Sequence, residues 1–374
     1  MKTKIVEWIK KETVLVVAWV LALLSMFFVP PDGGYVGYVD TRTLLLLFSL
    51  MGVTAGCRAL GLFHRLGEKL LCRAKSTRQL EFLLVMLCFF SSMLITNDVA
   101  LITFVPFAVS VLRLAGQSKR ILFVVTMQTV AANLGSMLLP VGNPQNIYLY
   151  TQSGASVVEF VLLMLPYTVA SFLLLCGSLL LRKNRALVAF VQREDQQPLA
   201  RGKLAVYGVL FVLCLLAVLR VLPAWVAFAA VLVVLLAMDA PVLRQVDYAL
   251  LATFVGFFVF VGNMGRIPLL RQGIETMLLG HEALVSAALS QVISNVPAVL
   301  LLSGFTDAWQ LLLVGVNIGG LGTLIASMAS LISYKCIARE YPEQKGRYLA
   351  LFTGVNVVFL VILLLLCLVL TGGL

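Results

Sequence analysis

The sequence predicts an all-α polytopic membrane protein built from two inverted repeats, each with a re-entrant hairpin and a broken transmembrane helix. Three observations lead to this fold class: the composition, two apolar segments that polar residues interrupt, and a match of polar positions between the halves. The chain has 374 residues, 61% of them hydrophobic and 12% charged. Such a chain has too little polar surface for a water-soluble globule. Its length has room for roughly nine to eleven membrane elements.

The N-terminal part predicts two spans, at residues 13–29 and 43–63. The first follows a short basic start and could be read as a signal peptide, but no small-residue cleavage site follows it. Pro30 and Pro31 indicate a turn instead. The second span ends in a basic stretch, which the positive-inside rule places in the cytoplasm.

The first hairpin is predicted at residues 81–115. As one straight helix this apolar segment would be about 51 Å long, against a hydrocarbon core of about 30 Å. The polar sequence Thr96-Asn97-Asp98 divides it into two arms of about 15 residues, or about 22 Å, which is short for a full crossing. Basic residues flank both ends, so both ends are predicted in the cytoplasm, with the turn at Asn97.

The remaining segments complete two copies of one arrangement. The first repeat, residues 1–182, ends with a broken helix at 121–150 and a span at 157–181. Residues 183–222 form a cytoplasmic loop and a connector helix that inverts the second copy. The second repeat, residues 223–374, contains these predicted elements: spans at 224–238 and 248–262, an external interfacial segment, a hairpin at 283–306, a broken helix at 308–335 and a closing span at 348–370.

The charge distribution supports this topology. Of the 28 Lys and Arg residues, only Arg42, Arg220, Arg266 and Arg271 are predicted outside, as the positive-inside rule requires.

The two halves also align without gaps at their polar positions. Residues 95–100 align with 293–298, 133–135 with 317–319, and 142–143 with 326–327. Inverted repeats whose broken helices meet near the midplane are typical of secondary transporters, because related halves can expose a central site alternately. The sequence therefore predicts such a transporter.

The interrupted helices supply the candidate site residues. Helix N-termini that restart after each break suit an anionic substrate, so we predict these substrate-binding residues: Thr96, Asn97, Asn143, Ser294, Asn295, Thr323 and Ser327. Sodium prefers oxygen ligands from unwound backbone and Asn side chains, so we predict these cation-binding or coupling residues: Asn97, Asp98, Asn133, Gly142, Asn295, Asn317 and Gly322. Asp98 is the only acidic residue that the topology places deep in the membrane, where a carboxylate carries protons, binds cations or caps the returning helix.

Other functional classes have little support. The net charge of +11 comes from short loops and does not indicate nucleic-acid binding. His64 and His281 fall in predicted loops, and no HExxH or P-loop motif occurs, so we expect no catalytic residue and no enzyme activity. An intramembrane enzyme and a channel stay as alternatives, and continuous conductance would identify a channel. We expect no cofactor or metal other than sodium, if sodium is the coupling ion.

Four segments resemble the ion transporter superfamily, which includes citrate-transporter-like permeases, divalent anion:sodium symporters, arsenite permeases and sodium/proton antiporters. They are ITNDVALITFVP at 95–106, VGNPQNIYLY at 141–150, SQVISNVPAVLLLSGF at 290–305 and NIGGLGTLIASMASLISY at 317–334. The resemblance covers nearly the whole chain. It implies a bacterial inner-membrane permease that moves a small anion, a di- or tricarboxylate or an oxyanion, with a sodium or proton gradient, and it implies a homodimer.

The tip motifs depart from those of the symporters at one position. The symporters carry Ser-Asn-Thr at both tips, whereas Asp98 and Val296 stand at the third position here. An Asn-Asp tip is closer to the arsenite permeases and the sodium/proton antiporters. An arsenite-type efflux permease and a sodium/proton antiporter are therefore open alternatives.

Overall fold

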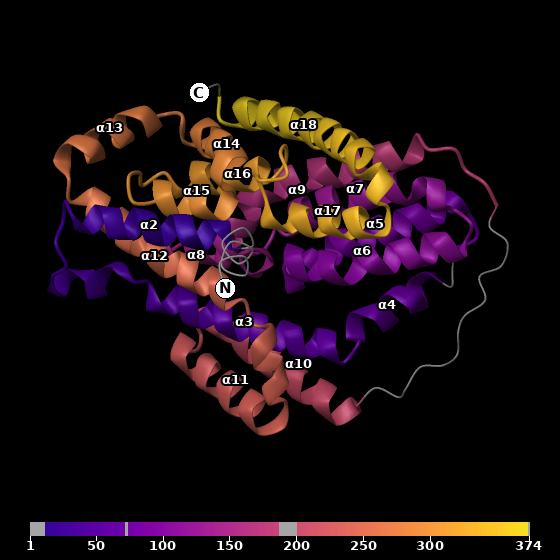
Figure 1. The fold of residues 1–374 in the computed structure, drawn as a ribbon, viewed down its shortest axis with the longest axis horizontal. Coiled ribbons are helices and arrows are strands. Elements are labelled where there is room, and N and C mark those ends of the chain that lie inside the picture. The colour runs from indigo at the N-terminus through magenta and orange to yellow at the C-terminus, as the bar shows by residue number, and fades with distance from the viewer. Residues whose placement is uncertain (1–11, 72–73, 187–199, 373–374) are drawn as a thin grey trace.

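The computed structural model describes residues 12–71, 74–186 and 200–372, which form helices joined by short connections (Figure 1). The predicted cytoplasmic loop lies partly outside the described residues, at 187–199. The first half contains α2 (Thr13–Met26), α3 (Thr41–Ala59), α4 (Leu62–Leu71), α5 (Thr77–Ile95), α6 (Asn97–Leu114), α7 (Ile121–Gly135), α8 (Pro144–Ser153) and α9 (Val157–Leu180). After the connector α10 (Arg201–Val218), the second half contains α11 (Ala224–Met238), α12 (Tyr248–Gly265), α13 (Pro268–Leu278), α14 (Glu282–Ile293), α15 (Asn295–Leu302), α16 (Trp309–Gly319), α17 (Met328–Glu340) and α18 (Lys345–Leu370).

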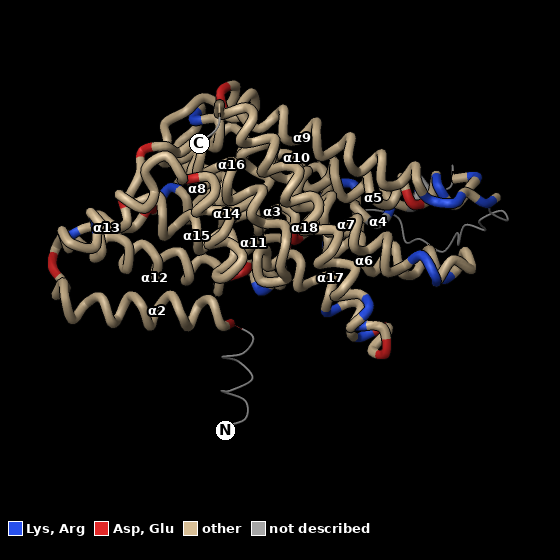
Figure 2. The backbone as a smooth tube through the Cα atoms, turned by 90° about the horizontal axis from the view of Figure 1, so that it is seen from above, with Lys and Arg blue, Asp and Glu red and all other residues tan. Residues whose placement is uncertain are grey.

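The helices are those of a multi-pass membrane protein. Within the described ranges, seven helices are long and apolar enough to cross a bilayer, or eight if α13 and α14, bent by 109°, form one span. The helices α2, α11 and α16 are apolar but shorter, with 14, 15 and 11 residues. In Figure 2 most charged residues lie near helix ends, and the middle of the molecule is largely uncharged. The all-helical membrane fold is thus confirmed, while the count of nine spans stays a prediction.

Both halves show the same succession of elements. Two helices are followed by a short amphipathic helix, a hairpin, a two-part broken helix and a closing helix, and α10 joins the two copies. The amphipathic helices α4 and α13 were not foreseen as helices: α4 lies in the predicted basic stretch, and α13 in the predicted interfacial segment. The matching order is what a repeat predicts, and the inverted orientation of the copies stays a prediction.

Glycines at equivalent positions bring each broken helix against its hairpin. A Cβ atom on Gly135 of α7 would lie 2.1 Å from the carbonyl oxygen of Phe89 and 2.7 Å from Ser92 Oγ. A Cβ atom on Gly319 of α16 would lie 2.7 Å from Ala287 Cα and 3.0 Å from Ser290 Cβ. The contacts are equivalent in the gap-free alignment, since Phe89 and Ser92 match Ala287 and Ser290. Only glycine permits this distance in either half.

The first hairpin differs from the prediction in its length. It begins at Thr77 rather than at residue 81, and its arms have 19 and 18 residues, so the expectation of arms too short to cross is wrong for this hairpin. The first turn is polar and Ser76 caps it, which hid it from a search for apolar residues. Glu81 is fully buried because Arg120 lies 2.8 Å away. The second hairpin does have short arms, of 12 and 8 residues.

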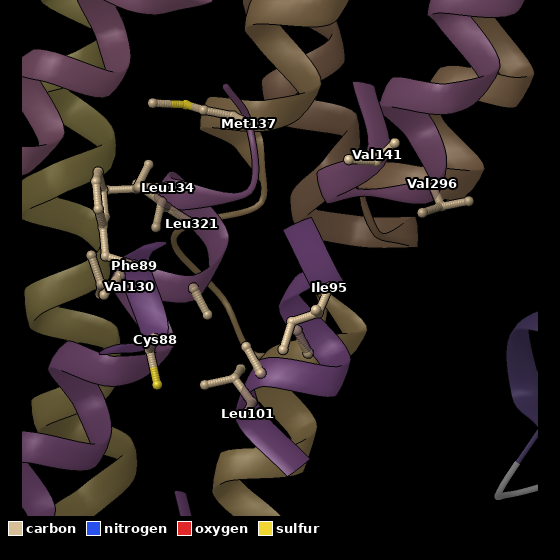
Figure 3. Close-up of a cluster of buried hydrophobic side chains, with 14 of the residues drawn as sticks. Cys88, Phe89, Ile95, Leu101, Val130, Leu134, Met137, Val141, Val296 and Leu321 are labelled. Atoms are coloured by element: carbon tan, nitrogen blue, oxygen red, sulfur yellow. The ribbon is translucent and has the colours of Figure 1, made fainter. Parts of the chain in front are cut away.

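The two arms of the first hairpin lie against the same side of α7. Gln128 Nε2 of α7 donates hydrogen bonds to the carbonyl oxygens of Leu84 in one arm, at 3.1 Å, and Phe104 in the other, at 3.3 Å. One side chain can reach both arms only if the chain turns back on itself near residue 96. Apolar side chains surround this turn, including Ile95 and Leu101, and Val296 lies at the other tip (Figure 3).

Candidate functional site

The two hairpin tips have the same backbone conformation. Thr96 has φ 69° and ψ 152°, and Ser294 has φ 78° and ψ 155°, a region that β-branched and other non-glycine residues rarely adopt. The next residues, Asn97 and Asn295, begin α6 and α15, and in each the side-chain Oδ1 accepts a hydrogen bond of 2.9 Å from the following backbone N–H. Strained backbone of this kind is concentrated at functional sites, so the tips are the first candidates.

Asn133 of α7 connects the first tip to the second half. Its Oδ1 accepts hydrogen bonds from Asn97 Nδ2, at 3.0 Å, and from Ser327 Oγ, at 3.1 Å. Its Nδ2 lies 3.4 Å from both the carbonyl oxygen of Gly320 and Ser330 Oγ. Three predicted site residues, Asn97, Asn133 and Ser327, are therefore in direct contact although they lie far apart in the sequence.

Asn146 holds the break of the first broken helix. Its Nδ2 donates to the carbonyl oxygens of Ser136, Met137 and Leu139 at 3.2 to 3.4 Å, just beyond the end of α7. Its Oδ1 accepts a hydrogen bond of 2.7 Å from Asn317 Nδ2 of α16. Asn146 was not predicted as a site residue, although its place in the polar break was a usable signal.

Gln291 holds the second break in a similar way. Its Nε2 donates to the carbonyl oxygens of Gly319, at 2.8 Å, and Leu321, at 3.0 Å, and its Oε1 accepts from the Thr323 N–H at 3.0 Å. Thr323 Oγ1 donates back to the Gln291 carbonyl at 3.0 Å, and Gly322 adopts φ 99° between them. Thr323, predicted to bind substrate, thus lies in the support of the break. Gln291, a polar residue in an apolar arm, was missed.

A cavity of about 510 Å³ lies between the two tips and the helices α3 and α12. We call it the tip cavity. The predicted site residues that line it are Thr96, Asn97, Asp98, Asn143, Asn295 and Ser327. The structure brings these residues together at one cavity. Their proximity could not be predicted from the sequence alone.

The other predicted residues do not line the tip cavity. Ser294 lines a neighbouring, mostly apolar cavity of about 710 Å³ beside α2 and α12. The remaining ones support the breaks behind the cavity wall: Asn133, Gly142, Asn317, Thr323 and Gly322. Their predicted roles in binding or coupling stay predictions.

The tip cavity contains charges of both signs. Asp98 shares its wall with Asp247, whose Oδ1 caps α12 by accepting from the Leu250 N–H at 2.9 Å. Arg58, which donates to Gln245 Oε1 at 3.0 Å, and Lys335 of α17 are the cations of the described lining. Glu12 also lines the cavity. Sequence reasoning singled out Asp98 but none of these other four charged residues; Glu12, Arg58 and Asp247 stand at helix ends, and Lys335 lies within α17.

Comparison with known proteins identifies the family. A family model described as citrate transporter matches residues 3–310. The chain is 34% identical over 317 residues to the inner membrane protein YbiR of Escherichia coli (strain K12), covering 83% of each chain. It is 30% identical over 330 residues to the transporter MJ0456 of Methanocaldococcus jannaschii, covering 87% of this chain and 88% of the relative.

A shorter match joins it to the silicon efflux transporter LSI3 of Oryza sativa subsp. japonica, with 32% identity over 153 residues, or 40% of this chain and 30% of the relative. The resemblance inferred from the tip and break motifs is confirmed. A helical fold with the tips and broken helices at one cavity agrees with transport, and the relatives' names agree with no enzyme activity. The chain is thus a multi-pass membrane transporter that belongs to the citrate transporter family.

Proposed function

We propose that this protein is a secondary active transporter that moves a small anion across the bacterial inner membrane, coupled to a sodium or proton gradient. The observation that carries the proposal is the arrangement of four helix N-termini at the tip cavity. The helices α6, α8, α15 and α17 begin at Asn97, Pro144, Asn295 and Met328, and these first residues all line the cavity.

None of these four N-termini is capped by the side chain of its own N-cap residue. The positive ends of the helix dipoles attract anions, although the backbone N–H groups of Asp98, Asn295 and Val296 are already hydrogen-bonded within the protein. Arg58 and Lys335 add positive charge to the same wall. A carboxylate or an oxyanion that fits about 510 Å³ suits this environment.

The predicted topology gives the cavity a side. Arg58, Gln245 and Lys335, which line the cavity together with the tips, belong to segments predicted at the cytoplasmic face. On this predicted topology we infer that the cavity opens to the cytoplasm. Exchange between this state and one open to the outside would move substrate across the membrane.

A coupling cation has a candidate ligand on the second broken helix. Asn317 Oδ1 is buried and accepts no hydrogen bond from the described residues, while Asn317 Nδ2 is held by Asn146 and the Leu313 carbonyl. An oriented, unused oxygen beside unwound backbone is what a sodium ion requires. A homodimer remains part of the proposal through the family resemblance alone.

A second candidate function is efflux of an oxyacid of the arsenite or silicic acid type, or sodium/proton antiport. Asp98 and Asp247 on the cavity wall favour it, because two carboxylates repel an anion in a poorly solvated site. The matches to LSI3, named as a silicon efflux transporter, and to a putative transporter named arsB of Dictyostelium discoideum point the same way.

Transport by purified protein in proteoliposomes tests the proposal. Uptake of dicarboxylates, arsenite and sodium is measured under imposed sodium and pH gradients, and we expect gradient-driven uptake of one of the anions. Asn97→Ala and Asn295→Ala are expected to abolish it. The matched control is Asn356→Ala in α18, a buried asparagine whose Nδ2 donates only to the Phe352 carbonyl and which lines neither cavity. Normal coupled uptake by both tip variants would refute the site.

A further inference from the structure

The second cavity, of about 710 Å³, runs beside α2 and α12 and reaches the second hairpin tip. We call it the lateral cavity. Ser294, Val296 and Pro297 of the tip form part of its wall. Helix α12 contacts both α2 and α15 and lies between them in Figure 2. Most of the other lining is aliphatic or aromatic, and it includes Val14, Leu21, Leu250, Phe257, Leu289 and Leu331.

The charged residues of the described lining lie at one end of the lateral cavity. They are Glu12 and Asp247, the N-cap residues of α2 and α12. These two helices pack side by side, and the predicted topology starts both of them at the cytoplasmic face. The lateral cavity is therefore polar at the cytoplasmic interface and apolar further into the membrane.

Neither empty space nor water suits the apolar part. Engineered cavities that stay dry have about 150 Å³, and the loss of stability grows with the volume left empty. A buried water needs two to four polar partners. In this part of the described lining, Thr253 Oγ1 already donates to the Ala249 carbonyl at 2.7 Å, and Ser294 Oγ lies 3.4 Å from the Ala326 carbonyl. The occupant that fits is therefore apolar.

The lateral cavity is open to lipid and has the length of one leaflet. Val17, Val292 and Ile325 line it and are 43%, 69% and 56% exposed, and exposed apolar side chains of a membrane-spanning protein face acyl chains. Its lining on α12 extends from Ala249 to Phe260, or about 16 Å at the helical rise of about 1.5 Å per residue. One leaflet is half of a hydrocarbon core of about 30 Å, or about 15 Å.

We propose that the lateral cavity binds one acyl chain of a phospholipid of the cytoplasmic leaflet, with the headgroup at the level of Glu12 and Asp247. The chain fills the apolar part of the cavity and contacts Val296 and Pro297. The lipid is thus a specific partner of the second hairpin, in addition to the bilayer that surrounds the whole protein. Its binding is independent of which substrate is transported.

Retention of lipid by the purified full chain tests the site. The protein is extracted in mild detergent, and its mass is measured with non-covalent ligands preserved. We expect wild type to keep one phospholipid per protomer. Ala249→Phe should lose it, because Ala249 lines the lateral cavity and not the tip cavity, so the ring would take the place of the chain. The matched control, Ala229→Phe in α11, should keep it, because Ala229 is exposed and lines neither cavity.

Three outcomes of the mass measurement would overturn the proposal. They are a wild-type protein without a retained phospholipid, one that retains only detergent or free fatty acid, and an Ala249→Phe protein that retains as much phospholipid as wild type.

Photolabelling of wild type locates the chain without any substitution, so its result does not depend on how a variant folds. The protein is reconstituted in vesicles of phosphatidylethanolamine and phosphatidylglycerol that contain some phosphatidylethanolamine with a diazirine on one acyl chain. Labels should be concentrated in residues 249–260 and 289–297 and should saturate. Helix α11 is the internal reference, since Val233 is 63% exposed and lines neither cavity. Labels spread evenly over α11 and the lateral cavity would show only the surrounding bilayer and refute the site.

Discussion

The contact between the first hairpin and its broken helix makes a sharp prediction for Gly135. An alanine there would place its Cβ 2.1 Å from the Phe89 carbonyl oxygen and 2.7 Å from Ser92 Oγ. The carbonyl belongs to the backbone of α5, so it cannot move aside as a flexible side chain can. Overpacking in a close-packed interior costs about 1–3 kcal/mol, and we expect Gly135→Ala to fall at the upper end of that range.

The matched control is the same substitution at Gly177, in the last turn of α9. No atom lies within 4 Å of a Cβ built there, and alanine is favoured over glycine in helix interiors by about 1 kcal/mol. Gly177→Ala should therefore be neutral or stabilising. The two variants should differ by about 3 kcal/mol or more, because overpacking contributes up to about 3 kcal/mol and the helix propensity of alanine adds to the difference. Gly319→Ala, whose nearest contact is 2.7 Å to Ala287 Cα, should fall between them.

Apparent melting temperature of the purified protein in detergent is the assay, with all variants heated at one rate because membrane proteins of this size unfold irreversibly. A difference of about 3 kcal/mol should separate Gly135→Ala from Gly177→Ala by about 5 °C or more. Coincident melting of the two variants would show that α5 and α7 are not in the contact described. If the melting temperature rises from Gly135→Ala through Gly319→Ala to Gly177→Ala, the result would support an equivalent contact in both halves.

Two further predictions concern topology and coupling. Single cysteines at Lys75 and Arg113, in a background without the seven native cysteines, should both react with a membrane-impermeant reagent from the cytoplasmic side, because the chain turns back at Asn97 and both flanks are basic; labelling from opposite sides would contradict the hairpin. Asp98→Asn should change the sodium or pH dependence of uptake in proteoliposomes and spare the choice of substrate, because a carboxylate on the cavity wall suits a cation or a proton. If the dependence on both gradients is unchanged, Asp98 has no part in coupling and only stabilises the N-terminus of α6.

Much of the fold followed from the sequence because lipid restricts what a chain can do. Unpaired backbone groups are costly in a bilayer, so a polar stretch within an apolar segment has to mark a break. This reasoning located both tips, at Asn97 and Asn295, and both breaks. It failed at the start of the first hairpin, where Ser76 caps a polar turn and Arg120 pairs with the buried Glu81. A capped, polar first turn of a helix has the same sequence signature as a loop.

The site was predicted less completely than the fold. Asn97, Asn143, Asn295 and Ser327 were expected and do line one cavity. Gln145 stood in the same polar break as Asn143 and was passed over. Nothing in a local pattern distinguishes a glutamine that is bonded within the protein from one that is left without a partner.

The sequence by itself determined the class of protein, the positions of the tips and breaks, and the correspondence between the halves, because composition, the cost of polar groups in lipid and local alignment are properties of short segments. Only the tertiary structure decided which oxygen and nitrogen atoms are already used. Asn133 bonds Ser327 across 194 residues of sequence, whereas Asn143 Oδ1 and Gln145 Nε2 have no hydrogen-bond partner among the described residues. Hydrogen-bond partners are selected by distances between segments that only packing brings together, and those distances separate a supporting residue from one that can bind substrate.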